Sequence, residues 1–196
     1  MKVVSKHPAT YADLEAVPPH LVAEILFGHL VTHPRPVPRH GGATSALGMV
    51  VGGPHQLGIG GPGGWIFVDE PELHLGPHIV VPDIAGWRRE RMTEGPDKAF
   101  IDIAPDWVCE ALSLSTEKHD KGAKRTIYAL YGVDFLWQLD PRPRSLETFQ
   151  RADKSWLVTG IFFDDEEVKA PPFDATTFSL SLLWPFDPPQ SADSAT

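Results

Sequence analysis

The chain has 196 residues, 42% of them apolar, which suits a single domain with a buried core. Its 17 basic and 26 acidic residues give a net charge of −9, which argues against a protein that binds nucleic acid mainly through non-specific phosphate contacts. Its one cysteine, Cys109, excludes an intramolecular disulfide, and neither a secretory signal nor an apolar run of about 18 residues is found, so we expect a soluble, cytoplasmic protein without a membrane span.

The first half of the chain predicts helices, an apolar segment and loops. In chain order we expect a helix over residues 9–18, an apolar segment over 20–34, an extended segment over 35–40, a short helix over 42–53 and a glycine-rich loop over 52–68. Thr10 is a suitable N-cap for the first helix, and Pro18 ends it. Gly28 indicates a hairpin or a change from helix to strand. The glycine-rich stretch lacks the lysine and hydroxyl of a phosphate-binding loop.

The second half predicts strands on both sides of one helix. We expect strands over residues 64–76 and 77–87, a polar exposed connection over 88–100, a strand over 104–113, a helix over 118–132 closed by Gly132, a strand over 133–140, a turn over 141–145, a hairpin of 146–152 with 154–163, and a disordered tail over 187–196. This order favours an α/β or α+β fold, a mixed β-sheet flanked by helices, in a single domain over residues 1–186.

Two carboxylates stand at the ends of predicted strands. Asp83 follows Pro82, where a β-branched run stops, and a turn-capping role would also explain it. Glu110 lies inside an apolar strand and shares a face with Val108 and Leu112. A buried carboxylate costs several kcal/mol unless a cation meets it, so Glu110 either faces solvent on an edge strand or has a positive partner.

Lys124 lies on the inward face of the predicted helix. At about 100° per residue it falls in the apolar stripe of Ile127, Tyr128 and Tyr131, and Asp120 falls in the same stripe. Lys121 lies at the border of the stripe, so the sequence leaves open whether it takes the place of Lys124. A lysine that extends to the surface and pairs with Asp120 is the structural alternative.

Asp83, Glu110 and Lys124 together predict metal-assisted chemistry. Two carboxylates at adjacent strand ends can hold Mg²⁺ or Mn²⁺ through oxygen, with waters completing the coordination. A lysine from the next helix can orient a water or stabilise developing negative charge. We therefore predict that a metal ion, with Lys124 close by, meets Glu110, and that the site hydrolyses phosphodiesters.

These residues also carry a family resemblance. The stretches "VVPDIAGW" and "APDWVCEALSLSTEKHDKGAKRTIYALYGVDFLWQLDP" resemble the "putative restriction endonuclease" family of the PD-(D/E)xK nuclease superfamily, and the resemblance runs from about Tyr11 to Leu183. It implies a restriction-endonuclease-like fold with Asp83 and Glu110 as metal ligands. The usual lysine two positions after the glutamate is replaced by Leu112, and Lys124 matches a lysine moved to the helix.

The upstream segment matches the family less closely. Glu24 corresponds to a glutamate that joins or supports the metal site, although a buried hydrogen-bond partner would also explain it. His40 corresponds to a recurrent histidine without a defined role, and a surface or loop position is the simpler interpretation. The sequence departs from the family pattern at Leu114 and Gln138. Neither residue takes part in the predicted chemistry.

The leading hypothesis is therefore an Mg²⁺- or Mn²⁺-dependent endonuclease that hydrolyses DNA phosphodiester bonds. A homodimer is expected because sheet edges in small domains often pair, and a basic rim of Arg88, Arg89 and Arg91 could offset the negative charge. The alternative is a catalytically silent nuclease-fold protein that serves as a binding or scaffold domain. A histidine-based cupin metal site is disfavoured, because the nine histidines include no H-x-H spacing.

Overall fold

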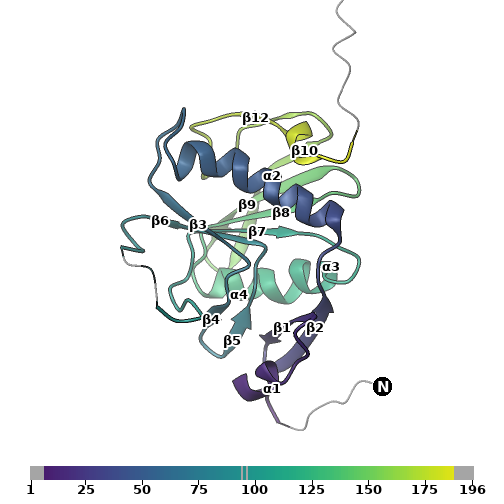
Figure 1. Ribbon diagram of the computed structural model, residues 1–196. Coiled ribbons are helices and arrows are strands. Elements are labelled where there is room, and N and C mark those ends of the chain that lie inside the picture. Colours follow the sequence, from purple (N-terminus) through teal and green to yellow (C-terminus); the bar gives the residue numbers. More distant parts are fainter. Residues whose placement is uncertain (1–6, 94, 96, 188–196) are drawn as a thin grey trace, which may run out of the picture.

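The computed structural model describes residues 7–93, 95 and 97–187 and is built around one six-stranded sheet (Figure 1). The strand order is β10-β9-β8-β7-β6-β3. The strands are β3 (Trp65–Asp69), β6 (Ile84–Arg88), β7 (Trp107–Ala111), β8 (Phe135–Asp140), β9 (Ser145–Ala152) and β10 (Ser155–Phe163). Among the described strands of this sheet, β7 and β8 pair in parallel, and a helical connection joins them. The predicted mixed sheet flanked by helices is confirmed.

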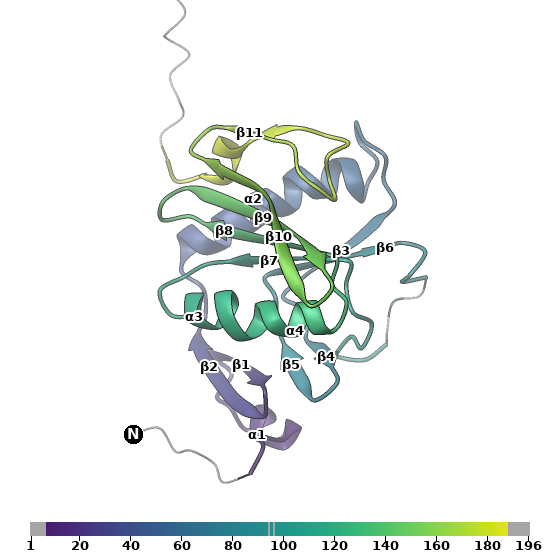
Figure 2. The same ribbon diagram turned by 180° about the vertical axis from the view of Figure 1, so that it is seen from behind.

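Helices cover both faces of this sheet (Figures 1 and 2). One face carries α2 (Pro38–His55), and the other carries α3 (Glu117–His119), the π-helical segment η1 (Asp120–Lys124) and α4 (Arg125–Leu130). Alternation along β7 divides its side chains between two cores. Trp107 and Cys109 belong to the core on the α2 side, and Val108 belongs to the core that contains Ile127 of α4. Glu110 therefore lies on the α4 side.

A smaller sheet lies on the α4 side of the main sheet (Figure 1). Its order is β2-β1-β5-β4, formed by β1 (Leu21–Leu26), β2 (His29–Pro34), β4 (Leu73–Leu75) and β5 (His78–Val80), and α1 (Tyr11–Glu15) precedes it. Leu26, Leu73 and Val80 belong to the core on the α4 side. The small sheet therefore packs on the same side of the main sheet as Glu110. The remaining elements are β11 (Glu167–Val168), β12 (Phe178–Ser179) and the 3₁₀ segment η2 (Leu180–Leu183).

Most predicted elements are confirmed, with corrections around α2 and in the predicted strands over 64–76 and 77–87, each of which is divided into two shorter strands. The first helix has the predicted Thr10 cap, and the segment over 20–34 is the β1–β2 hairpin, which turns at Gly28 with φ +77°. The extended prediction over 35–40 was wrong for its second half. Pro38 begins α2, because proline at the first helical position needs no amide hydrogen and has a helical φ. The same helix runs on to His55, into the predicted glycine-rich loop.

Two further predictions concern the limits of the domain. The boundary of a single domain over 1–186 stays a prediction. The predicted tail over 187–196 lies outside the described residues except for Asp187. In the part of the chain that the structure describes, no helix combines the length and the apolar character that a membrane crossing needs.

Candidate active site

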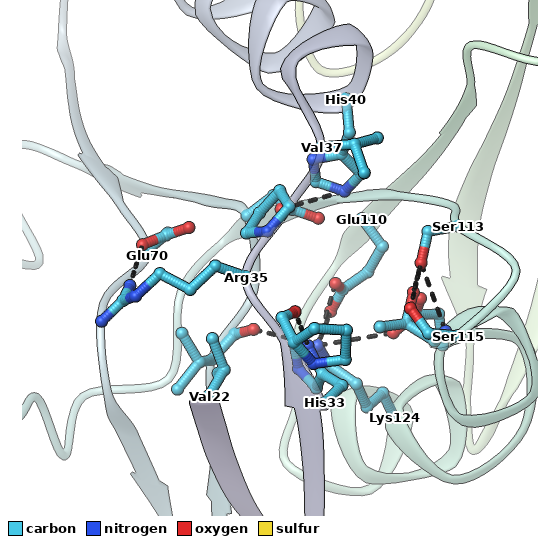
Figure 3. A pocket seen from close by; sticks show the side chains of 16 residues that line it. Val22, His33, Arg35, Val37, His40, Glu70, Glu110, Ser113, Ser115 and Lys124 are labelled. Carbon is cyan, nitrogen blue, oxygen red and sulfur yellow. Dashed lines mark hydrogen bonds and ion pairs between the residues drawn. The ribbon is translucent and has the colours of Figure 1, made fainter. Parts of the chain in front are cut away.

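A pocket of about 90 Å³ opens where β6, β7, α2, β2 and the helical connection meet (Figure 3). Its walls include Asp83, Glu110, Lys124 and His40, so three of the four predicted site residues line one cavity. The volume is enough for several waters or a hydrated ion. Glu24, the fourth, does not line the pocket but contacts Lys124 from β1.

Glu110 is met directly by Lys124. The Lys124 Nζ lies 2.8 Å from Glu110 Oε1 and 2.9 Å from Oε2, and the two residues are 2% and 1% exposed. Tyr128, one turn further along the helix, donates its hydroxyl hydrogen to Glu110 Oε1 at 2.5 Å. Burial raises the pKa of Glu110 well above its usual value, and the charge of Lys124 offsets only part of this effect. The carboxylate that the sequence marks as anomalous thus has a cation and a hydroxyl as partners.

The Lys124 ammonium lies close to carboxylates from three segments, β1, β7 and η1. Its Nζ lies 3.1 Å from Glu24 Oε1 and 3.6 Å from Asp120 Oδ1, and it donates to the Val81 carbonyl at 3.0 Å. Burial lowers the pKa of Lys124, but the surrounding carboxylates, Glu110 first and Glu24 next, raise it well above its usual value. Lys124 therefore stays protonated, and it acts as a hydrogen-bond donor and positive charge rather than as a base.

Strand register places Asp83 beside Glu110. Asp83 directly precedes β6, whose Ile84 is paired with Cys109 of β7, so both carboxylates stand at the same edge of the sheet. Asp83 Oδ2 accepts a hydrogen bond from the Ala111 N–H at 2.7 Å. Burial raises the pKa of Asp83 from 3.8 to about 6, against the opposing charges of His40 and Lys124.

The π-helical segment η1 carries both candidate lysines, Lys121 and Lys124. Asp120 and Lys124 are both buried in it, whereas Lys121 lies on the surface and donates to Glu117 at 3.0 Å. Lys124, not Lys121, is the lysine at the pocket. A π turn is a local departure from the regular helix that occurs frequently at functional sites.

Three features of the site escaped sequence reasoning. His40 lies in the first turn of α2 and contacts both Asp83 and the Ala111 carbonyl, whereas a surface or loop position was the simpler prediction. Tyr128 was assigned only to the apolar stripe of the helix, although its place one turn after Lys124 already put it on the site face. No sequence pattern indicates that the Val81 backbone contacts Lys124 through its carbonyl and Glu24 through its N–H.

The proposed basic rim lies elsewhere. Arg88 is at the far end of β6 from Asp83, about 17 Å away for five residues of extended chain. Arg91 is paired with Asp106 at 2.7 Å, so its charge is already balanced. The guanidinium that does line the pocket belongs to Arg35, whose Nη1 lies 3.8 Å from Glu70.

The donor chemistry of the pocket fits a hard divalent ion. Asp83, Glu110 and Asp120 line the pocket together with the Lys124 ammonium, so an added cation would balance negative charge. Among the described residues, no three side chains of His, Cys, Asp or Glu are gathered as a ready ligand set.

Comparisons with known proteins identify the family and the fold. The sequence profile of the Uma2 family, described as "Putative restriction endonuclease", matches residues 8–182. A crystal structure of "a putative nuclease belonging to DUF820" from Anabaena variabilis superposes with a TM-score of 0.73 at 20% sequence identity, covering 90% of this chain and 98% of that chain. At this identity the likeness establishes the fold alone. No curated protein matches the sequence.

Proposed function

The chain belongs to the Uma2 family, described as "Putative restriction endonuclease", and from that premise we propose that it is a metal-dependent endonuclease that hydrolyses DNA phosphodiester bonds. The observation that carries the proposal is the buried contact between Glu110 and Lys124 in a pocket that Asp83 also lines. A nuclease of this kind needs carboxylate oxygens for a metal ion and a cation near the scissile phosphate, and Asp83, Glu110 and Lys124 would supply them.

We assign Asp83 and Glu110 as the ligands of an Mg²⁺ or Mn²⁺ ion. Both are carboxylates at the same edge of the sheet, and both line the pocket. When bound, a divalent ion supplies Lewis acidity, which polarises the phosphoryl group and lowers the pKa of an attacking water.

Lys124 then supplies positive charge to the reaction. Because its pKa is raised, it can donate a hydrogen bond to a phosphoryl oxygen or to a water, and it stabilises the negative charge that develops during hydrolysis. Glu24 supports this role from β1, since it contacts Lys124 and is itself held by the Val81 N–H at 2.8 Å. We therefore assign Glu24 as a residue that orients Lys124.

The substrate must approach a protein that carries a net charge of −9. Most surface arginines cannot help, because carboxylates already pair with Arg39, Arg91, Arg142, Arg144 and Arg151. Arg35 is more weakly held and borders the pocket, so we propose it as a phosphate contact. A homodimer would provide a second such contact.

A catalytically silent nuclease-fold binding or scaffold protein is the second candidate. The acidic net charge favours it, because free DNA is repelled at low ionic strength. A buried ion pair such as Glu110 with Lys124 can also persist for structural reasons.

A plasmid-nicking assay with Mn²⁺ separates the two candidates. We expect the wild type to nick supercoiled DNA, and we expect Glu110→Gln and Lys124→Ala to lose at least about 100-fold in rate, as is typical when charge stabilisation is removed. Lys121→Ala is the matched control, since this exposed lysine of the same segment is paired with Glu117. Equal nicking by all four proteins would discard the assigned roles, and no nicking by the wild type on any DNA form would favour the silent candidate.

A further inference from the structure

His40 reaches the pocket from an element that no assigned site residue uses. It lies in the first turn of α2 and is 7% exposed. Figure 3 shows its ring on the side of the pocket that faces α2, with Glu110 and Lys124 beyond it. The ring Nε2 lies 2.7 Å from the Ala111 carbonyl oxygen and 3.4 Å from Asp83 Oδ1. One nitrogen therefore contacts both strand ends that form the site.

The partners of His40 determine where its hydrogen lies. A backbone carbonyl only accepts hydrogen bonds, so at 2.7 Å the Nε2 must carry the hydrogen and donate it. The other ring nitrogen, Nδ1, is buried and has no hydrogen-bond partner among the described residues. A buried nitrogen without a partner lowers stability, so packing alone does not account for a histidine here.

The contacts of His40 complete those of Asp83. Asp83 Oδ2 accepts a hydrogen bond from the Ala111 N–H at 2.7 Å, and Oδ1 lies 3.4 Å from the His40 Nε2 atom. The Ala111 carbonyl, on the same residue as that N–H, is held by His40 as well. Without the imidazole, the Ala111 carbonyl oxygen would lose its hydrogen-bond donor, and Asp83 Oδ1 would lose its contact with the ring.

We propose that His40 is a positioning residue of the metal site: its Nε2–H donates to the Ala111 carbonyl and its ring lies against the Asp83 carboxylate, so that Asp83, which accepts from the Ala111 N–H, presents oxygen to a divalent ion. This inference rests on the proposed function, because it takes Asp83 as a metal ligand. His40 is not itself a ligand, since the nitrogen that faces the site is the one that carries hydrogen. Groups that hold metal ligands by hydrogen bonds typically change metal affinity 10–100-fold, as an order of magnitude.

Mn²⁺ binding to the full-length protein tests the proposal without any substrate. We expect His40→Ala to weaken Mn²⁺ affinity about 10–100-fold in isothermal titration calorimetry. His40→Gln should recover most of the affinity, because its amide nitrogen reaches as far as Nε2 does. His40→Asn, whose amide is shorter, should remain as weak as the alanine variant. If His40→Ala does not fold, the difference in Mn²⁺ affinity between His40→Gln and His40→Asn still tests the proposal.

A second buried histidine of α2 provides the matched control. His55 is 1% exposed and contacts Thr176 Oγ1 at 3.0 Å, away from the pocket. His55→Gln should leave Mn²⁺ affinity unchanged, whatever it does to the melting temperature.

Three results would overturn the inference for His40. The first is unchanged or tighter Mn²⁺ binding in folded His40→Ala or His40→Asn. The second is failure of His40→Gln to differ from His40→Asn. The third is coupling between Mn²⁺ and an imidazole nitrogen in pulsed electron paramagnetic resonance of the wild type, which would make His40 a ligand. By contrast, a wild type that binds no Mn²⁺ at all would contradict the proposed function itself.

Discussion

Replacement of Asp83 by Asn is expected to stabilise the metal-free protein at neutral pH. Burial raises the pKa of Asp83 from 3.8 to about 6, so the folded protein binds this proton more tightly than the unfolded chain does. A shift of about 2 units at about 1.4 kcal/mol per unit corresponds to about 3 kcal/mol of lost stability once the carboxyl is ionised. Asn cannot ionise, and its carbonyl oxygen can still accept from the Ala111 N–H.

The stability advantage of Asp83→Asn should increase with pH. Stability that comes from the proton on Asp83 is fully present below pH 4, the unfolded pKa, and is lost as the pH rises through about 6, the folded pKa. The advantage of Asp83→Asn over the wild type should therefore be small at pH 4 and reach its maximum above pH 6. For a chain of this size, about 3 kcal/mol corresponds to roughly 6–12 °C in melting temperature.

Urea unfolding in EDTA between pH 4 and pH 8 measures this difference. Asp106→Asn is the matched control, because Asp106 is a buried aspartate of the same sheet region that pairs with Arg91 and accepts from the Arg88 N–H, so its replacement should destabilise. An Asp83→Asn protein that is less stable than the wild type at pH 7, or a difference that does not vary with pH, would refute the reasoning.

Three further predictions concern Lys124, Tyr128 and Arg89, which follows β6. Lys124→Ala should destabilise the protein by about 3–5 kcal/mol in urea unfolding, because it leaves buried carboxylates without their cation, and a loss below about 1 kcal/mol would contradict this. Tyr128→Phe should cost about 1–3 kcal/mol, since Glu110 loses a buried hydroxyl partner, and an unchanged urea midpoint would argue against that contact. Arg89→Ala should leave Mn²⁺-dependent nicking unchanged, because this arginine follows the end of β6 remote from the pocket, and a large loss of rate would restore the idea of a basic rim.

Asp83, Glu110 and Lys124 could be predicted as site residues because they lie on elements that follow one another along the chain. Asp83 and Glu110 end neighbouring antiparallel strands, so alternation and strand order suffice to bring them together. Helical periodicity turns Lys124 inward, even though the π turn makes the helix locally irregular. The apolar stripe that marks Lys124 also includes Tyr128, whose hydroxyl contact depends on the exact distance to Glu110.

Long-range contacts account for what the sequence could not supply. Glu24 and Lys124 meet only because the small sheet packs on the α4 side of the large one, and no local pattern encodes that packing. His40 was assigned to an extended segment by its prolines, whereas one of them starts the helix that carries it into the site. The Arg88–Arg91 prediction failed because clustering in sequence does not say at which end of a strand the site lies.

A crystal of the protein soaked in Mn²⁺ tests the central claim most directly, because anomalous scattering locates the ion without any substrate. The account predicts a peak about 2.0–2.2 Å from oxygens of both Asp83 and Glu110. A well-occupied peak elsewhere, or none while the carboxylate of Glu110 remains bound only to Lys124 and Tyr128, would contradict it.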